Sequence, residues 1–144
     1  MTGISTRIII HLLHVFIIGV LFLYVGFTRD AIPPFFFPGL VGLGGIILVY
    51  HIYKAYLKIV HSSLPWVNLI HIFGIAPLLI FIGYNREKTP RYMYEILLLF
   101  GFASIGYHGY YILEDSGFVL FPKQGGTTCV GELCYSRSKE ERLA

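Results

Sequence analysis

The chain has little formal charge and almost no cysteine. Only 13% of its 144 residues are Asp, Glu, Lys or Arg, whereas a soluble domain carries about 25%. This deficit excludes a disordered chain and disfavours an ordinary water-soluble enzyme. The two cysteines, Cys129 and Cys134, have no histidine near them, so they give little indication of a metal site and are expected to be free thiols.

Motifs for phosphate binding and for catalysis are also lacking. The sequence contains no glycine-rich phosphate loop, no nucleophile elbow and no paired carboxylates. Its net charge of +3 is spread over several loops and gives no basic face for nucleic acid. We therefore expect a protein that is not an enzyme and does not bind nucleic acid.

Apolar residues, 56% of the chain, fall in four blocks at residues 8–27, 35–60, 62–84 and 92–113. Each block is long enough to cross a bilayer, for which a helix needs about 20 residues. The sequence thus predicts an all-α membrane protein with four transmembrane helices and the lipid bilayer as its surroundings. Residues 116–144 are rich in glycine and charge, which predicts a polar C-terminal tail outside the membrane.

The second half of the membrane region resembles the first at an offset of 57 residues. This offset matches Gly-x-x-Arg-acid at Gly26 with the same pattern at Gly83, and Tyr-His-x-Tyr at Tyr50 with the same pattern at Tyr107. It also matches His14 with His71. We infer two tandem hairpins, residues 1–61 and 62–115, that enter the membrane in the same direction and are related by a pseudo-twofold axis along the membrane normal.

This topology places both termini on one side of the membrane. Basic residues near the span ends are balanced, four on each side. Charge therefore does not predict which side that is, and the sequence does not indicate which membrane holds the protein.

Histidine is the main ionisable residue within the spans. At a rise of about 1.5 Å per residue, four histidines lie roughly 8 to 15 Å from the side that holds the termini. They are His14, His51, His71 and His108. Because an ionisable group inside a membrane is a functional candidate by default, this layer is where we look for function.

Four roles for this layer remain open. Histidine and tyrosine side chains that only hydrogen-bond across helices would make the protein a non-enzymatic membrane component, which is our main expectation. A b-type haem would use His51 and His108 as axial ligands, or His14 and His71, beside Tyr50 and Tyr107. In that case Gly44 and Gly101 would leave space for the macrocycle.

The other two roles use the same four histidines. Imidazoles at a single depth suit a transition metal such as zinc or copper. Histidine also exchanges protons near neutral pH, which suits proton or cation conduction. Conduction needs polar groups in the other half of the bilayer as well, where the spans offer little beyond Tyr24 and the backbone near Pro77.

Several short motifs resemble a known group of proteins. They are residues 50–54 (YHIYK), 71–73 (HIF), 76–79 (APLL), 82–83 (IG) and 106–108 (GYH). They resemble small uncharacterised membrane proteins encoded by large DNA viruses of algae and protists, and the resemblance covers the four spans. It implies a viral membrane protein of the virion's internal membrane, whose partners are further copies or other virion proteins. It brings no catalytic residues.

Overall fold

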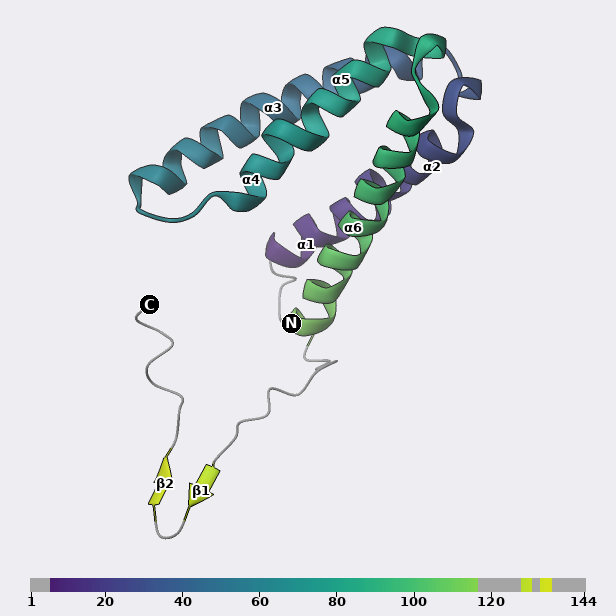
Figure 1. Ribbon diagram of the computed structural model, residues 1–144. Coiled ribbons are helices and arrows are strands. Elements are labelled where there is room, and N and C mark those ends of the chain that lie inside the picture. Colours follow the sequence, from purple (N-terminus) through teal and green to yellow (C-terminus); the bar gives the residue numbers. More distant parts are fainter. Residues whose placement is uncertain (1–5, 117–127, 131–132, 136–144) are drawn as a thin grey trace. The chain divides into compact units, whose positions relative to one another are not determined.

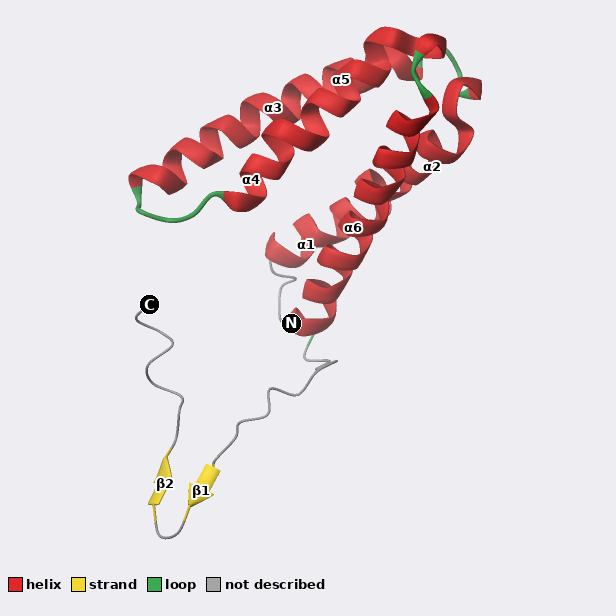
Figure 2. Cartoon of the chain, in the orientation of Figure 1, coloured by secondary structure: helices red, strands yellow, loops and turns green. Residues whose placement is uncertain are grey.

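The computed structural model describes residues 6–116, 128–130 and 133–135, and Figure 2 shows that helices dominate this part. Four helices are long and apolar enough to cross a membrane: Thr6–Ala31, Phe36–Val60, Trp66–Lys88 and Arg91–Asp115. We call them spans 1 to 4. The prediction of four membrane-spanning helices is confirmed at this level, and the protein fits a multi-pass integral membrane protein. The predicted tail lies almost entirely outside the described residues.

Spans 1 and 3 are interrupted helices, whereas spans 2 and 4 are the continuous helices α3 (Phe36–Val60) and α6 (Arg91–Asp115). Span 1 consists of α1 (Thr6–Leu13), the π-helix η1 (His14–Gly19), α2 (Val20–Thr28) and the 3₁₀ turn η2 (Arg29–Ala31). Span 3 consists of α4 (Trp66–Ile70), the π-helix η3 (His71–Ile75), α5 (Ala76–Asn85) and the 3₁₀ turn η4 (Arg86–Lys88).

The π-helical segments begin at His14 and His71, two of the predicted site residues. Short π-helical segments are rare and often lie at functional sites. Pro77 is the second residue of α5, which follows η3, but η1 has no proline near it. Proline is therefore not required for this irregularity.

Spans 1 and 3 also end alike. Arg29 has φ 56° and ψ −128°, and Arg86 has φ 52° and ψ −130°. A positive φ is unfavourable for arginine, because its Cβ crowds the backbone in this region. Two strained arginines at the same point of two turns indicate that the chain reverses in the same way after each span.

Glycines bring span 2 against span 3 and span 1 against span 4. A Cβ atom added to Gly83 would lie 2.5 Å from the Phe37 carbonyl oxygen, and one added to Gly44 would lie 2.8 Å from the Ile80 side chain. One added to Gly26 would lie 2.6 Å from the Leu98 side chain. Figure 1 shows α3 beside α4 and α5, and α6 beside α1 and α2. The closest contacts of these glycines therefore join helices from different predicted hairpins.

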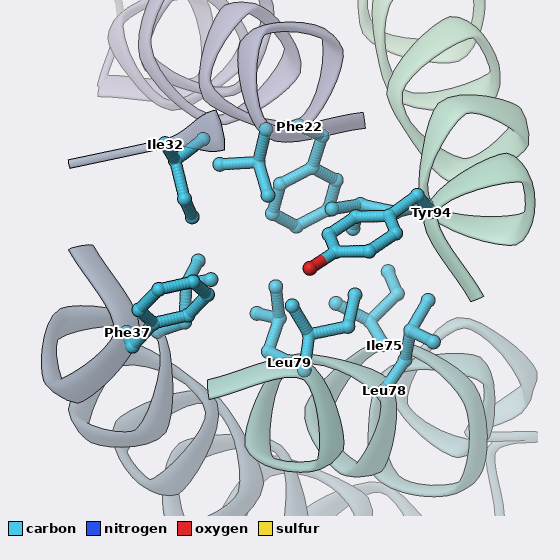
Figure 3. Packing of buried hydrophobic residues seen from close by; sticks show 11 residues of the cluster. Phe22, Ile32, Phe37, Ile75, Leu78, Leu79 and Tyr94 are labelled. Carbon is cyan, nitrogen blue, oxygen red and sulfur yellow. The ribbon is translucent and has the colours of Figure 1, made fainter. Parts of the chain in front are cut away.

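The hydrophobic core holds all four spans together near the Arg29 and Arg86 turns. Figure 3 shows Phe22 of span 1, and Ile32 directly after that span, facing Phe37, Leu79 and Tyr94. The side chains of Phe22, Leu79 and Leu97 are fully buried, and those of Phe37 and Tyr94 are 1% exposed. Tyr94 also donates a hydrogen bond to the Arg86 carbonyl oxygen at 3.4 Å. This core fills the half of the spans that adjoins the two turns.

The chain divides into two compact units, Met1–Ile112 and Leu113–Ala144. In the second unit, β1 (Thr128–Val130) pairs antiparallel with β2 (Leu133–Tyr135). The register places Cys129 opposite Cys134.

Candidate functional site

A cavity of about 300 Å³ adjoins the core at Phe22 and Ile75, on the side away from the Arg29 and Arg86 turns, and all four spans line it. This volume is at the lower end of the range for small-molecule sites, about 300 to 1,000 Å³. Most of the wall is apolar or aromatic: Leu13, Ile18, Phe22, Ile47, Trp66, Val67, Ile70, Ile75, Phe100, Ala103 and Tyr107. The remaining lining residues are Ser104 and four histidines, His14, His51, His71 and His108.

The four histidines form two stacks, one in each helix pair. The rings of His51 and His71 stack with centroids 3.9 Å apart and an interplanar angle of 14°. The rings of His14 and His108 stack at 4.3 Å and 29°. Protonating both rings of a stack would bring two cations together in surroundings of low dielectric constant, which costs much free energy. Each stack therefore holds at least one neutral imidazole.

Hydrogen bonds determine the tautomer of three of the four imidazoles. His14 Nδ1 lies 2.8 Å from the Ile10 carbonyl oxygen, and His71 Nδ1 lies 2.7 Å from the Val67 carbonyl oxygen. A carbonyl oxygen only accepts, so both Nδ1 atoms carry the proton. His51 Nδ1 donates in the same way to Asn68 Oδ1 at 3.0 Å. In a neutral ring Nε2 is then an acceptor.

His108 has a different partner. Its Nδ1 lies 2.8 Å from Nδ1 of His11, so one of these two nitrogens donates to the other. His11 also stacks on Tyr111, with centroids 5.4 Å apart. His11 was not assigned to the site from the sequence, although it lies three residues before His14.

Asn68 is the other residue that the sequence reasoning missed. It is 6% exposed and one of two buried polar residues, with Thr89, among the described side chains. It occupies the position 57 residues after His11, so the repeat offset was the signal that could have found both residues. Each forms a hydrogen bond with Nδ1 of a stacked histidine, Asn68 with that of His51 and His11 with that of His108.

The Nε2 atoms remain accessible. Among the described residues, Arg29 Nε is the one fully buried side-chain nitrogen or oxygen without a hydrogen-bond partner. None of the four cavity histidines is therefore sealed off at Nε2. The cavity thus has apolar walls, and the neutral rings of His14, His51 and His71 leave the Nε2 lone pair unused.

Five of the eight predicted site residues line the cavity: His14, His51, His71, His108 and Tyr107. Tyr50 does not line it and instead stands edge-on to His51, with ring centroids 5.1 Å apart. Tyr107 stands edge-on to His108 with the same separation. The four predicted histidines thus lie in the cavity wall together with Trp66, Ser104 and apolar side chains that were not predicted to belong to the site.

The expectation for Gly44 and Gly101 was wrong. A Cβ at Gly44 would meet Ile80 and the Ala76 carbonyl oxygen, and a Cβ at Gly101 would lie 3.0 Å from Leu23. The space that we expected for a macrocycle is therefore filled by the neighbouring helix. These glycines allow close helix packing, as small residues do in membrane bundles.

The described residues give no support to the alternative of a metal site. No group of three or more His, Cys, Asp or Glu side chains among the described residues is arranged to hold a metal ion. Stacking explains this result, because rings packed face to face direct their nitrogens sideways and not toward a common centre. In each stack, one histidine therefore packs against the other and does not share a metal ion with it.

The Asn68 hydrogen bond has a measurable consequence. Replacing Asn68 with leucine removes the acceptor of His51 Nδ1, and such a bond contributes about 1 kcal/mol. We expect the population of the Nε2–H tautomer of His51 to rise about fivefold, as measured from ¹⁵N chemical shifts of labelled histidine. Asn85→Leu is the control, since Asn85 bonds the Phe81 carbonyl oxygen at the other end of span 3. An unchanged His51 spectrum in Asn68→Leu would contradict the assignment.

Comparison of the chain with protein-family models, with curated proteins and with solved structures found no match.

Proposed function

We propose that this is a non-enzymatic integral membrane protein that binds a small ligand in the histidine-lined cavity. The observation that carries the proposal is the cavity itself, about 300 Å³ in volume and lined by all four spans. Its wall contains no carboxylate or thiol, and the Ser104 hydroxyl donates to the His14 carbonyl oxygen and not to a histidine nitrogen, so serine and histidine do not form a nucleophile–base pair there. An apolar pocket with a few convergent polar groups is the form that most small-molecule sites take.

The proposed architecture is a tandem repeat of two parallel hairpins with a pseudo-twofold axis along the membrane normal. Paired contacts support it, since each has a counterpart 57 residues away. The stack of His51 on His71 corresponds to that of His108 on His14. The Gly83 contacts with Phe37 and Val41 correspond to the Gly26 contacts with Tyr94 and Leu98. In this arrangement both termini lie on one side, and the histidines and tyrosines form a layer in the half of the bilayer nearest them.

Filling the cavity tests the proposal. Ala103 lines the cavity, so Ala103→Phe should occupy part of it and displace the ligand. Gly106 lies one turn further along α6, where an added Cβ meets nothing within 4 Å, so Gly106→Phe is the matched control. We expect native mass spectrometry to find a bound small molecule on the wild type and on Gly106→Phe, and at least a tenfold lower occupancy on Ala103→Phe. Bare masses for all three would refute ligand binding.

A b-type haem is the second candidate ligand. Histidines that bind metals donate their other ring N–H to a carbonyl or a similar acceptor, and His51 does so to Asn68. His108 comes from the other helix pair and lines the same cavity. Against haem stand the filled spaces beside Gly44 and Gly101. A Soret band in the purified protein that is lost in His51→Ala and His108→Ala would establish haem, and a colourless preparation would exclude it.

Proton or cation conduction receives less support. The core beyond the cavity is closed by fully buried apolar side chains, among them Phe22, Leu79 and Leu97. Tyr94 and Thr89 are the polar side chains buried near it. A conduction pathway needs polar groups through this half as well, so we expect no pH-driven flux in liposomes.

A further inference from the structure

We propose that the cavity selects ligands that donate hydrogen bonds, specifically a phenol or hydroquinone ring that enters from the lipid phase. This inference rests on the proposed ligand binding and adds the chemical class of the ligand. It follows from which ring nitrogens the protein has already used. His14, His51 and His71 donate their Nδ1–H to acceptors within the protein. Their neutral rings therefore offer a ligand only the lone pair at Nε2.

A cavity with acceptors and few donors discriminates between ligands by their own hydrogen-bonding groups. A hydroxyl group pairs with Nε2, whereas an ether or a ketone of the same shape leaves two acceptors facing each other. The lining offers few donors to a ketone or an ether, namely the Ser104 hydroxyl, the Tyr107 hydroxyl, the Trp66 indole and, when His11 donates to it, the Nε2–H of His108. Ser104 already donates to the His14 carbonyl oxygen at 3.4 Å. Hydroxyl groups can donate to the unused Nε2 lone pairs, so the lining favours a ligand that carries them.

The apolar wall adds the requirement for a ring. Phe22, Phe100, Trp66 and Tyr107 line the cavity, and aromatic pairs gain about 0.5 to 1.5 kcal/mol beyond the area that they bury. A cavity of roughly 150 Å³ holds one benzene molecule, so about 300 Å³ accommodates one ring with a short substituent. Because the wall belongs to helices that are apolar enough to span a membrane, such a ligand arrives dissolved in lipid.

Two probes of similar shape test this inference. Hydroquinone has two hydroxyl donors, and 1,4-dimethoxybenzene has the same ring with no donor. Trp66 is the one tryptophan of the chain and lines the cavity, so its fluorescence reports occupancy, with calorimetry as a second measurement. We expect hydroquinone to bind at least tenfold more tightly, since each of its two hydroxyl groups can form a hydrogen bond that contributes about 1 kcal/mol, or about fivefold in Kd.

Removing one acceptor should reduce this preference without closing the cavity. In His51→Phe and His71→Phe the ratio of the affinity for hydroquinone to that for 1,4-dimethoxybenzene should fall at least threefold. Ala103→Phe should weaken both probes. Thermal unfolding of each variant establishes that it is folded, and if one His→Phe variant does not fold, the other carries the test.

The failures of the two proposals differ. Equal affinities for both probes in the wild type, or a ratio that no histidine replacement changes, would overturn the inference about donors and leave ligand binding intact. If neither probe binds and the native mass is that of the bare chain, ligand binding itself is wrong. Tight binding of hydroquinone with loss of the preference in His51→Phe supports both.

Discussion

Replacing Gly83 with alanine should destabilise the membrane helices by about 2 to 3 kcal/mol, the upper part of the range of about 1 to 3 kcal/mol for overpacking. The added Cβ would lie 2.5 Å from the Phe37 carbonyl oxygen and 2.9 Å from the Val41 amide nitrogen. Both are backbone atoms of α3, so no side-chain rotation relieves the clash and the helices must move apart. Unfolding in a mixture of mild detergent and dodecyl sulfate, followed by circular dichroism, measures the loss.

The control lies on the facing helix. A Cβ at Gly42 of α3 would meet nothing within 4 Å, so Gly42→Ala should be neutral or stabilise by up to about 1 kcal/mol through lower backbone entropy. Gly26→Ala should cost less than Gly83→Ala, because its nearest neighbours are atoms of the flexible Leu98 side chain at 2.6 Å. Equal stabilities for Gly83→Ala and Gly42→Ala would contradict the close approach of span 3 to span 2.

Leu79→Ala should be the other strongly destabilising change. Leu79 is fully buried in the core shared by the four spans. Leucine-to-alanine changes in soluble cores cost about 2 to 5 kcal/mol. We expect the lower end, about 2 kcal/mol, because the separated helix would rest in lipid, where the side chain is also among apolar groups. What is lost is therefore mainly packing against its neighbours.

Leu99→Ala separates packing from hydrophobicity. Leu99 is 69% exposed on α6, so its removal should change the free energy of unfolding by no more than about 0.5 kcal/mol. The same detergent unfolding assay applies to both variants. If Leu99→Ala cost as much as Leu79→Ala, the helices would not be packed around the core that Figure 3 shows.

The four spans were predictable because membrane helices depend on a local property of the chain. A run of about 20 apolar residues satisfies its own backbone hydrogen bonds and is stable in lipid without regard to its neighbours. The predicted blocks at residues 8–27 and 35–60 therefore match Thr6–Ala31 and Phe36–Val60 to within a few residues. The positions of the four histidines along the spans follow for the same reason.

The π-helical segments and the partners of the glycines were not predictable in this way. From the sequence, Gly44 predicts free space beside span 2, but the Ile80 side chain of span 3 occupies that space. Small residues permit close packing against any helix and do not select which one. Likewise, nothing local to His14 or His71 distinguishes a π-helical turn from an α-helical one, because both depend on the same backbone groups.

By itself, the sequence determined that this chain forms four helices long and apolar enough to span a membrane and that histidines recur within them. Only the tertiary structure decided that the histidines stack in two pairs and that a cavity remains between the helices. It also decided that Asn68 and His11 form hydrogen bonds with Nδ1 of His51 and of His108. The physical reason is that the two features depend on residues at different distances along the chain. Span formation depends on transfer of each helix into lipid, whereas a binding site depends on which side chains from distant segments come within hydrogen-bonding and stacking distance.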